Sequence, residues 1–256
     1  MIRTALLALV AFVLVPASAG AGTMRPPVGL TATPARISLA GSAGAAMRVT
    51  NPGRVAVTVD ATRAGFGLDL RGRPRVAPGG SRRAATAWLA VRPTRFVLAA
   101  GTSATVAVSA RVPASVEPGD HDALVLLTTR PSARPGLAVR MRLGVVVVVR
   151  APGRVARSLR LGGLRVRRAG GARILELWVA NAGNVTETLW RGRVRLLVGR
   201  RGGSARILAA PRELRPRTSG LVQMVYRGPL RGRVRARAEL VDPAGRVLRR
   251  TFRIRL

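Results

Sequence analysis

The one cluster of residue types suited to acid–base or metal chemistry is "DHD", where His121, the single histidine, stands between Asp120 and Asp122. An imidazole beside two carboxylates could hold a metal ion or relay a proton. The stretch follows the turn Pro118-Gly119 and predicts the start of a strand, in which successive side chains point to opposite faces. His121 would then point away from both aspartates, so we interpret the motif as a solvated strand start.

Other frames for catalysis are missing from the sequence. There is no Gly-x-Ser-x-Gly elbow for a serine nucleophile, no lysine for a Walker phosphate loop, and no cysteine for thiol chemistry, disulfides or thiolate metal sites. We therefore expect no enzyme, no cofactor and no metal site. A tryptophan platform for carbohydrate is the alternative, but Trp88 and Trp178 lie inside apolar strands and are interpreted as core residues, which leaves Trp190 undecided.

The composition is strongly basic, with 45 basic residues, all of them arginine, against ten acidic residues, a formal net charge of +35. Aromatic residues are 3% of the chain, too few for stacking on bases, so we expect no nucleic-acid partner. The expected counter-charges are those of the cell envelope, namely phosphate- or carboxylate-bearing wall polymers or an anionic membrane surface. The alternative is that arginine reflects the composition of a GC-rich genome.

The first residues predict export. A basic start, Met1-Ile2-Arg3, is followed by the apolar stretch 4–15 and then by small residues that suit cleavage after Ala19 or Ala21. Residues 1–21 are predicted to be a signal peptide, with an uncleaved N-terminal anchor as the alternative. We expect an extracellular or envelope-associated protein with no transmembrane helix after cleavage.

The mature chain is predicted to be all-β. Residues 25–150 contain seven or eight short strands separated by Gly and Pro turns, the stretch 151–154 is a short linker, and residues 151–256 contain a second set of strands. The stretches "RVTNPGRVAVTVDA" and "WVANAGNVTETLW" both run strand, Asn-x-Gly turn, strand. This echo favours two tandem antiparallel β-sandwiches, 25–150 and 151–256, over one large sheet.

The last segment predicts a hairpin with one apolar and one cationic face. A loop at 243–245 places Leu240 opposite Leu248 and Val234 opposite Ile254. Arginines occupy the outward positions, where they are either the ordinary polar face of a half-buried sheet or an anion-binding site. The predicted anion-binding residues are Arg233, Arg235, Arg237, Arg253 and Arg255.

The stretch "GLAVRMRLGVVVVVR", 136–150, is predicted to be the last strand of the first sandwich. Its uncharged run is too short to cross a membrane, which takes about 20 apolar residues. Two interpretations remain open. The strand is either a core strand, covered by the second sandwich where both of its faces are apolar, or an edge that pairs with a partner. The predicted partner-strand residues are Leu137, Val139, Met141 and Leu143.

The stretch "RPTRFVLAAGTSATVAVSARVPASVEPGDHDALVLLTT", with "MRVTNPGRVAVTVDA" before it, resembles the first Ig-like domain of the WxL-interacting bacterial surface proteins, a relative of the PapD-like chaperone domain. The resemblance covers residues 30–150 and implies a non-catalytic role in binding wall peptidoglycan and partner surface proteins. The sequence departs from that family in having no C-terminal membrane helix. The free two-domain chaperone relatives match the length better, and they complete a client fold by strand addition. Their carboxylate-binding basic pair cannot be assigned among so many arginines.

The sequence thus predicts two tandem Ig-like, PapD-like sandwiches after a signal peptide, and two functions. The first is a non-catalytic exported module that contacts anionic wall polymer or surface-protein partners. The alternative is a PapD-like chaperone for surface-fibre subunits. The ligand, the partner and the oligomeric state are not specified by the sequence.

Overall fold

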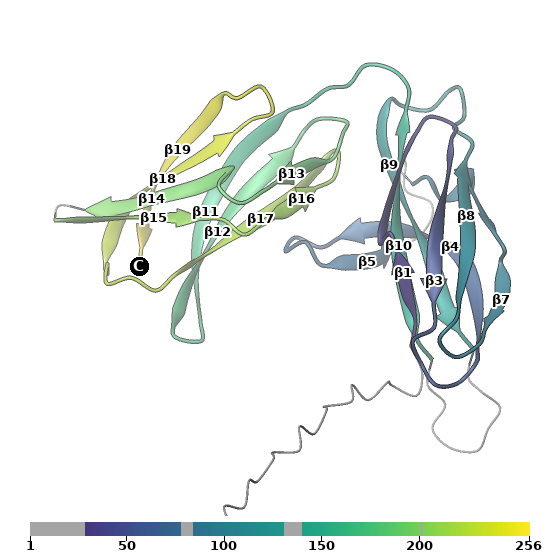
Figure 1. The fold of residues 1–256 in the computed structure, drawn as a ribbon. Coiled ribbons are helices and arrows are strands. Elements are labelled where there is room, and N and C mark those ends of the chain that lie inside the picture. The colour runs from purple at the N-terminus through teal and green to yellow at the C-terminus, as the bar shows by residue number, and fades with distance from the viewer. Residues whose placement is uncertain (1–28, 78–83, 131–139, 201) are drawn as a thin grey trace, which may run out of the picture.

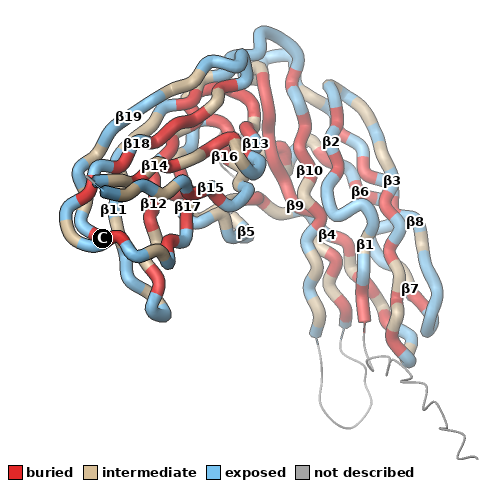
Figure 2. Tube along the Cα trace, turned by 60° about the vertical axis from the view of Figure 1, so that its left-hand side comes forward, coloured by how far each residue is buried: buried red, intermediate tan, exposed pale blue. Residues whose placement is uncertain are grey.

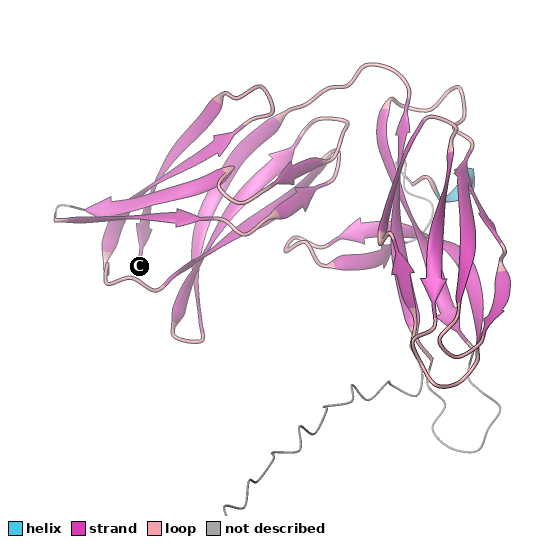
Figure 3. Cartoon of the chain, viewed as in Figure 1, coloured by secondary structure: helices cyan, strands magenta, loops and turns pink. Residues whose placement is uncertain are grey.

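The structure, a computed structural model, describes residues 29–77, 84–130, 140–200 and 202–256. Strands make up the regular structure of these ranges apart from one 3₁₀ turn, η1 (Thr86–Trp88) (Figure 3). The expected all-β fold class is therefore confirmed. In these ranges no helix has the length and apolar character needed to cross a membrane. The predicted signal peptide, residues 1–21, lies outside the described residues.

The strands up to residue 151 form two facing sheets (Figure 1). One sheet has the order β1-β3-β8-β6; the other has the order β2-β10-β9-β4-β5, with β7 also paired to β4. The strands are β1 (Thr31–Thr33), β2 (Arg36–Ala40), β3 (Gly44–Thr50), β4 (Val57–Leu68), β5 (Pro74–Ala77), β6 (Leu89–Arg92), β7 (Arg95–Leu98), β8 (Ser103–Ala110), β9 (Gly119–Thr129) and β10 (Arg142–Ala151). We call this part the N-terminal half.

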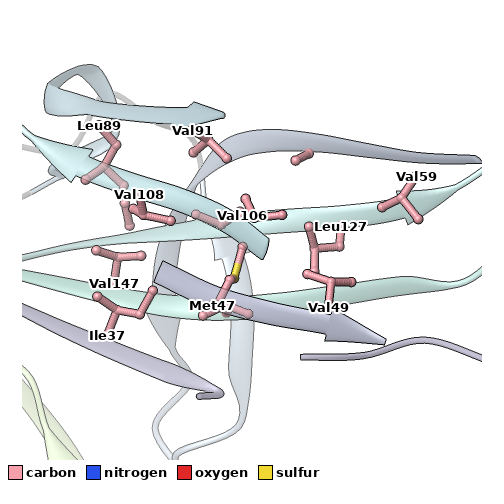
Figure 4. Close-up of a cluster of buried hydrophobic side chains, with 14 of the residues drawn as sticks. Ile37, Met47, Val49, Val59, Leu89, Val91, Val106, Val108, Leu127 and Val147 are labelled. Carbon is pink, nitrogen blue, oxygen red and sulfur yellow. The ribbon is translucent and has the colours of Figure 1, made fainter. Parts of the chain in front are cut away.

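The core of the N-terminal half lies between these two sheets and is built from aliphatic side chains (Figure 4). Strand β8 alternates exposed and buried residues, so that Val106 and Val108 face inward and are almost completely buried. Met47 of β3 lies opposite Val106 in the same sheet, and Val147 of β10 packs against this cluster from the facing sheet. Burying one such side chain contributes about 1.5–3 kcal/mol. The many valines and leucines therefore supply the apolar burial that the few aromatic residues do not.

The strands after residue 158 form separate sheets around a second core. The sheet orders are β11-β12-β17, β13-β16 and β15-β14-β18-β19. The strands are β11 (Leu159–Ala169), β12 (Ala172–Asn181), β13 (Glu187–Leu189), β14 (Val194–Arg200), β15 (Gly203–Leu208), β16 (Arg212–Leu214), β17 (Thr218–Tyr226), β18 (Arg233–Val241) and β19 (Val247–Arg255). This C-terminal half lies at an angle to the N-terminal half, and the β4–β5 hairpin reaches towards it (Figures 1 and 2).

The predicted register of the last hairpin is confirmed. Leu240 pairs with Leu248 and Val234 with Ile254 in the β18–β19 ladder. Gly245 closes the loop with a positive φ of 81°, a conformation that glycine adopts without steric cost. Arg250 falls opposite the small Ala238, and its guanidinium donates to the carbonyl of Leu161 at 2.8 Å.

The two Asn-x-Gly turns make the same pattern of hydrogen bonds. The Asn51 amide donates to the carbonyls of Val55, Leu98 and Ala99, and its oxygen accepts from Gly53 N–H. In the C-terminal half the Asn181 amide donates to the carbonyls of Val185 and Leu214, and its oxygen accepts from Gly183 N–H. Both asparagines are almost completely buried. Each side chain therefore satisfies buried backbone groups that no strand ladder reaches.

Candidate functional site: a free strand edge and the junction of the two halves

Among the described strands, none pairs with the β2 side of β10 at its start, and we call this stretch the free edge of β10. Its antiparallel ladder with β9 runs from Arg142 to Ala151, whereas its parallel ladder with β2 covers only Val146–Arg150. Val146 N–H donates to Ala35 and Arg150 C=O accepts from Gly41, so even-numbered residues direct their backbone groups to the β2 side. By the two-residue period of a strand, Arg142 and Gly144 then present backbone N–H and C=O groups where the described strands supply no partner.

The side chains of this edge continue the apolar face of the strand. Met141 and Leu143 are half-buried and pack against the N-terminal core. Val145, Val147 and Val149 of the same face are completely buried. The other two residues of the predicted partner strand, Leu137 and Val139, lie outside the described residues.

The second apolar face of β10 is covered by the C-terminal half. Val148 is 5% exposed and lines a hollow together with Thr186 and Thr188. Val146 lines another hollow together with Pro211 and Leu221. From Val145 onwards the stretch is a core strand whose second face packs against the C-terminal half. Before Val145 the described strands supply no neighbour on the β2 side, and the partner-strand role of this edge stays a prediction.

The Asp-His-Asp motif lies at the junction of the halves, and its interpretation as a solvated strand start is wrong. His121 is completely buried, its ring lies 4.6 Å from that of Trp88, and its Nε2 is 2.8 Å from the carbonyl oxygen of Glu117. The expected alternation holds, because Asp120 and Asp122 point the other way. The polar face of β9 was assigned to water, but the C-terminal half covers it.

The two aspartates bind partners that join the halves. Asp120 accepts from Arg150 at 2.7 Å and from the backbone N–H of Thr186 at 2.7 Å. Asp122 accepts from Arg215, and a backbone hydrogen bond of 2.8 Å runs from Asp120 N–H to Asn184 C=O. Ion pairs Arg36–Glu213 and Arg71–Glu176 extend the junction on either side.

The same surroundings shift the pKa values of the two carboxyl groups in opposite directions. Burial raises the pKa of Asp122, because its loss of hydration outweighs the pairing with Arg215. Burial also acts to raise the pKa of Asp120, but the hydrogen bonds from Arg150 and Thr186 together outweigh it and lower that pKa below the ordinary value of 3.8. Asp120 is therefore the carboxylate whose charge stabilises the junction.

This predicts a pH-dependent effect of Asp120→Asn. At pH 7 the substitution should lower the free energy of unfolding by about 2 kcal/mol, because it weakens hydrogen bonds to a charged group. A carboxyl with a lowered folded pKa contributes fully above 3.8 and loses that contribution as the pH falls through the folded value. The difference between wild type and variant in urea unfolding should therefore shrink below pH 3.8.

Glu213→Gln is the matched control, since it removes a partly exposed ion pair at the same junction, worth at most about 1 kcal/mol. A stability difference between wild type and the Asp120→Asn variant that stayed constant from pH 7 to pH 3 would contradict the assigned role of Asp120.

The predicted anion-binding arginines are brought together on one sheet face. Arg233 lies directly opposite Arg255, and Arg235 directly opposite Arg253, in the β18–β19 ladder. Arg237 lies on the same face of β18, with its Nε 3.6 Å from a carboxylate oxygen of Glu239. The alternation of arginines with apolar residues in the sequence was sufficient to predict that all five lie on one face of the hairpin.

The three tryptophans are spread over the molecule. Trp88 packs against the N-terminal core, as predicted. The prediction for Trp178 is wrong, because its side chain lies on the outer face of β12 over Gly162 and the residue is 37% exposed. Trp190 is 57% exposed and stacks on Arg193, whose guanidinium carbon lies 4.7 Å from the ring centroid. The described residues contain no group of three or more His, Asp or Glu side chains placed to hold a metal ion.

Sequence reasoning missed Gly144 and the junction residues. A glycine between two apolar residues of a strand could have marked a place where another backbone approaches closely. The aspartates of "DHD" carried a signal too, because carboxylates at alternate positions on an otherwise apolar strand need partners.

Two facing sheets, followed by a second β-sheet unit, make a PapD-like immunoglobulin fold, the fold of fimbrial chaperones. The structure is similar to a class 5 fimbriae chaperone, CfaA (12% identity, TM-score 0.51, covering 87% of this chain and 98% of that one). It is equally similar to a chain of the chaperone–tip adhesin complex of CFA/I fimbriae biogenesis (11% identity, TM-score 0.51, 87% and 98% covered). No protein-family model and no curated protein sequence matches the chain.

Proposed function

We propose that this chain is an exported PapD-like chaperone for surface-fibre subunits, made of two tandem Ig-like sandwiches, 25–150 and 151–256. The observation that supports the proposal most strongly is the free backbone edge of β10 at Arg142 and Gly144, next to the half-buried Met141 and Leu143. The similarity to fimbrial chaperones supports the same reading. The wall-binding role expected from the WxL-interacting resemblance stays a prediction, and the fold similarity favours the chaperone role over it.

In the proposed mechanism a client strand adds to β10. The N–H and C=O groups of Arg142 and Gly144, for which the described strands supply no partner, hydrogen-bond to the client backbone. This main-chain pairing supplies affinity with little dependence on client sequence. Met141 and Leu143 offer alternate apolar side chains to a client that lacks one of its own core strands. In sequence, Leu137 and Val139 continue this face towards the N-terminus.

The carboxylate-binding pair implied by the resemblance also has a candidate place. A hollow of about 330 Å³ between the halves is lined by Arg36 of β2 and Arg150 of β10. Their side chains are 38% and 46% exposed, so each could reach a client carboxylate. Arg36 already pairs with Glu213 and Arg150 with Asp120, and a client carboxylate would have to compete with both.

The experiment that tests this function uses an Ig-like fibre subunit from which one edge strand has been deleted. Mixed with the full chain, the subunit should form a one-to-one complex, and hydrogen exchange should slow at the amides of Arg142 and Gly144. The amide of Val146, which is already bonded to Ala35, should change little and serves as the internal control. A complex that left the Arg142 and Gly144 amides unprotected would refute strand addition.

A further inference from the structure

The outer face of the sheet β15-β14-β18-β19 carries an ordered array of arginines. Arg235 of β18 lies between Gly199 of β14 and Arg253 of β19, while Arg233 pairs with Arg255 at the end of the ladder. All four arginines are exposed. We call Arg233, Arg235, Arg253 and Arg255 the arginine ladder.

Charge on this face is separated into two regions. Glu239 is the sole carboxylate on these four strands, and three guanidiniums gather around it, from Arg195, Arg237 and Arg249, at 3.0, 3.6 and 3.4 Å. In the part of the chain that the structure describes, no carboxylate lies within 4.0 Å of any ladder guanidinium. One end of the sheet thus has one carboxylate among three guanidiniums, and at the other end the described residues place no carboxylate beside the four ladder arginines.

A hollow of about 850 Å³ adjoins the ladder. Gly199 and Ser204 line it and are closely packed, since a Cβ added to Gly199 would lie 3.2 Å from both Ser204 and the carbonyl oxygen of Gly203. Arg235, Ser204 and Thr251 line it, so hydroxyl donors stand beside a guanidinium, and its lining contains no carboxylate. This combination of donors favours an anion with several acceptor oxygens.

The geometry also favours a repeated anion. Alternate residues of a strand are about 6.8 Å apart and neighbouring strands about 4.8 Å apart. Like charges directly opposite each other destabilise a sheet, so a bound counter-charge would also stabilise the hairpin. Guanidinium forks bind phosphate in bidentate fashion. Insertion into a membrane would need exposed apolar side chains, and the exposed large apolar residues of the described chain lie outside β18 and β19.

We propose that the arginine ladder and the hollow beside it bind a linear polymer of repeated phosphate groups. The site lies on the C-terminal half, whereas strand addition is assigned to the start of β10 in the N-terminal half. The two proposals are therefore independent, and failure of one leaves the other standing.

The test measures binding of the full chain to linear inorganic polyphosphate, with orthophosphate at equal total phosphate as reference. We expect polyphosphate to bind and orthophosphate to bind far more weakly. The triple variant Arg235→Gln/Arg253→Gln/Arg255→Gln should bind polyphosphate at least about tenfold more weakly. The triple substitution should also reduce the magnitude of the negative slope of log affinity against log salt by about 2, since each single-strand phosphate contact contributes about 0.7.

The matched control removes the same charge from exposed arginines of the N-terminal half, Arg48→Gln/Arg54→Gln/Arg111→Gln, and should keep the wild-type slope. Equal loss in both triple variants would overturn the proposal, because net charge alone would then explain binding. Equal, ladder-dependent binding of polyglutamate or of phosphatidylglycerol vesicles would overturn the assignment to a phosphate polymer. Thermal melts check folding, and neither variant should melt earlier than wild type.

Discussion

Gly144→Pro should abolish capture of a fibre subunit while the free chain keeps its stability. The N–H of Gly144 faces the free edge of β10, so the β9–β10 ladder loses no hydrogen bond, and proline is tolerated on edge strands. A client strand would lose that hydrogen bond and would be pushed away by the ring, with loss of its neighbours as well. At about 1 kcal/mol for each bond, affinity should fall at least about 100-fold.

Gly144→Ala is the matched control, since it keeps the N–H. A Cβ at this position would lie 3.5 Å from Leu124 and 3.7 Å from Leu126, which is ordinary contact. The measurement is titration of the strand-deleted subunit against each variant, with thermal melting of the free proteins. Undiminished capture by the proline variant would place the client somewhere other than on the β10 edge.

The second large effect is expected at the two buried asparagines. Asn51→Ala and Asn181→Ala should each lower the free energy of unfolding by about 3–5 kcal/mol. Each substitution leaves two or three buried carbonyls and one N–H without a partner, at about 1–3 kcal/mol for a group that stays dry. Urea unfolding followed by fluorescence separates the halves, because Trp88 reports the first, while Trp178 and Trp190 report the second.

Thr50→Ala provides the comparison for this pair. Its hydroxyl bonds to Ser103 at 2.8 Å on the exposed side of β3, so the loss should stay below about 1 kcal/mol. Asparagine variants as stable as the Thr50 variant would show that the carbonyls find other partners. An effect of Asn51→Ala on the second transition as large as on the first would show that the halves unfold together.

Local pattern was enough to predict much of this fold. The β18–β19 register follows from alternation and one glycine turn, and the echo of the two Asn-x-Gly segments follows from sequence alone. The hairpin and each of the two Asn-x-Gly segments are built from residues that lie within about 20 positions of each other. The positions of Arg233, Arg235 and Arg237 on one face needed no more than the two-residue period of a strand.

Features that depend on distant packing could not be predicted in this way. His121 was assigned to solvent and Trp178 to the core, and both assignments are wrong because they depend on what covers a strand face. Whether water or the C-terminal half lies against β9 is decided by residues such as Thr186 and Arg215, more than 60 positions away. The free edge at Gly144 likewise depends on where β2 begins, at Arg36.

The ion pairing of the carboxylates has a consequence for proton exchange. Each of the ten acidic side chains lies within 4.0 Å of a guanidinium, and guanidinium stays protonated to about pH 12. Lysine is absent and the single histidine, His121, is enclosed beneath Trp88. The exposed ionisable groups of the described surface are therefore almost all arginines and arginine-paired carboxylates, which keep their charge around neutrality. Association with a partner should release or take up few protons, so its calorimetric heat should be the same in buffers of different ionisation enthalpy, and ionic strength rather than acidity will regulate its encounters.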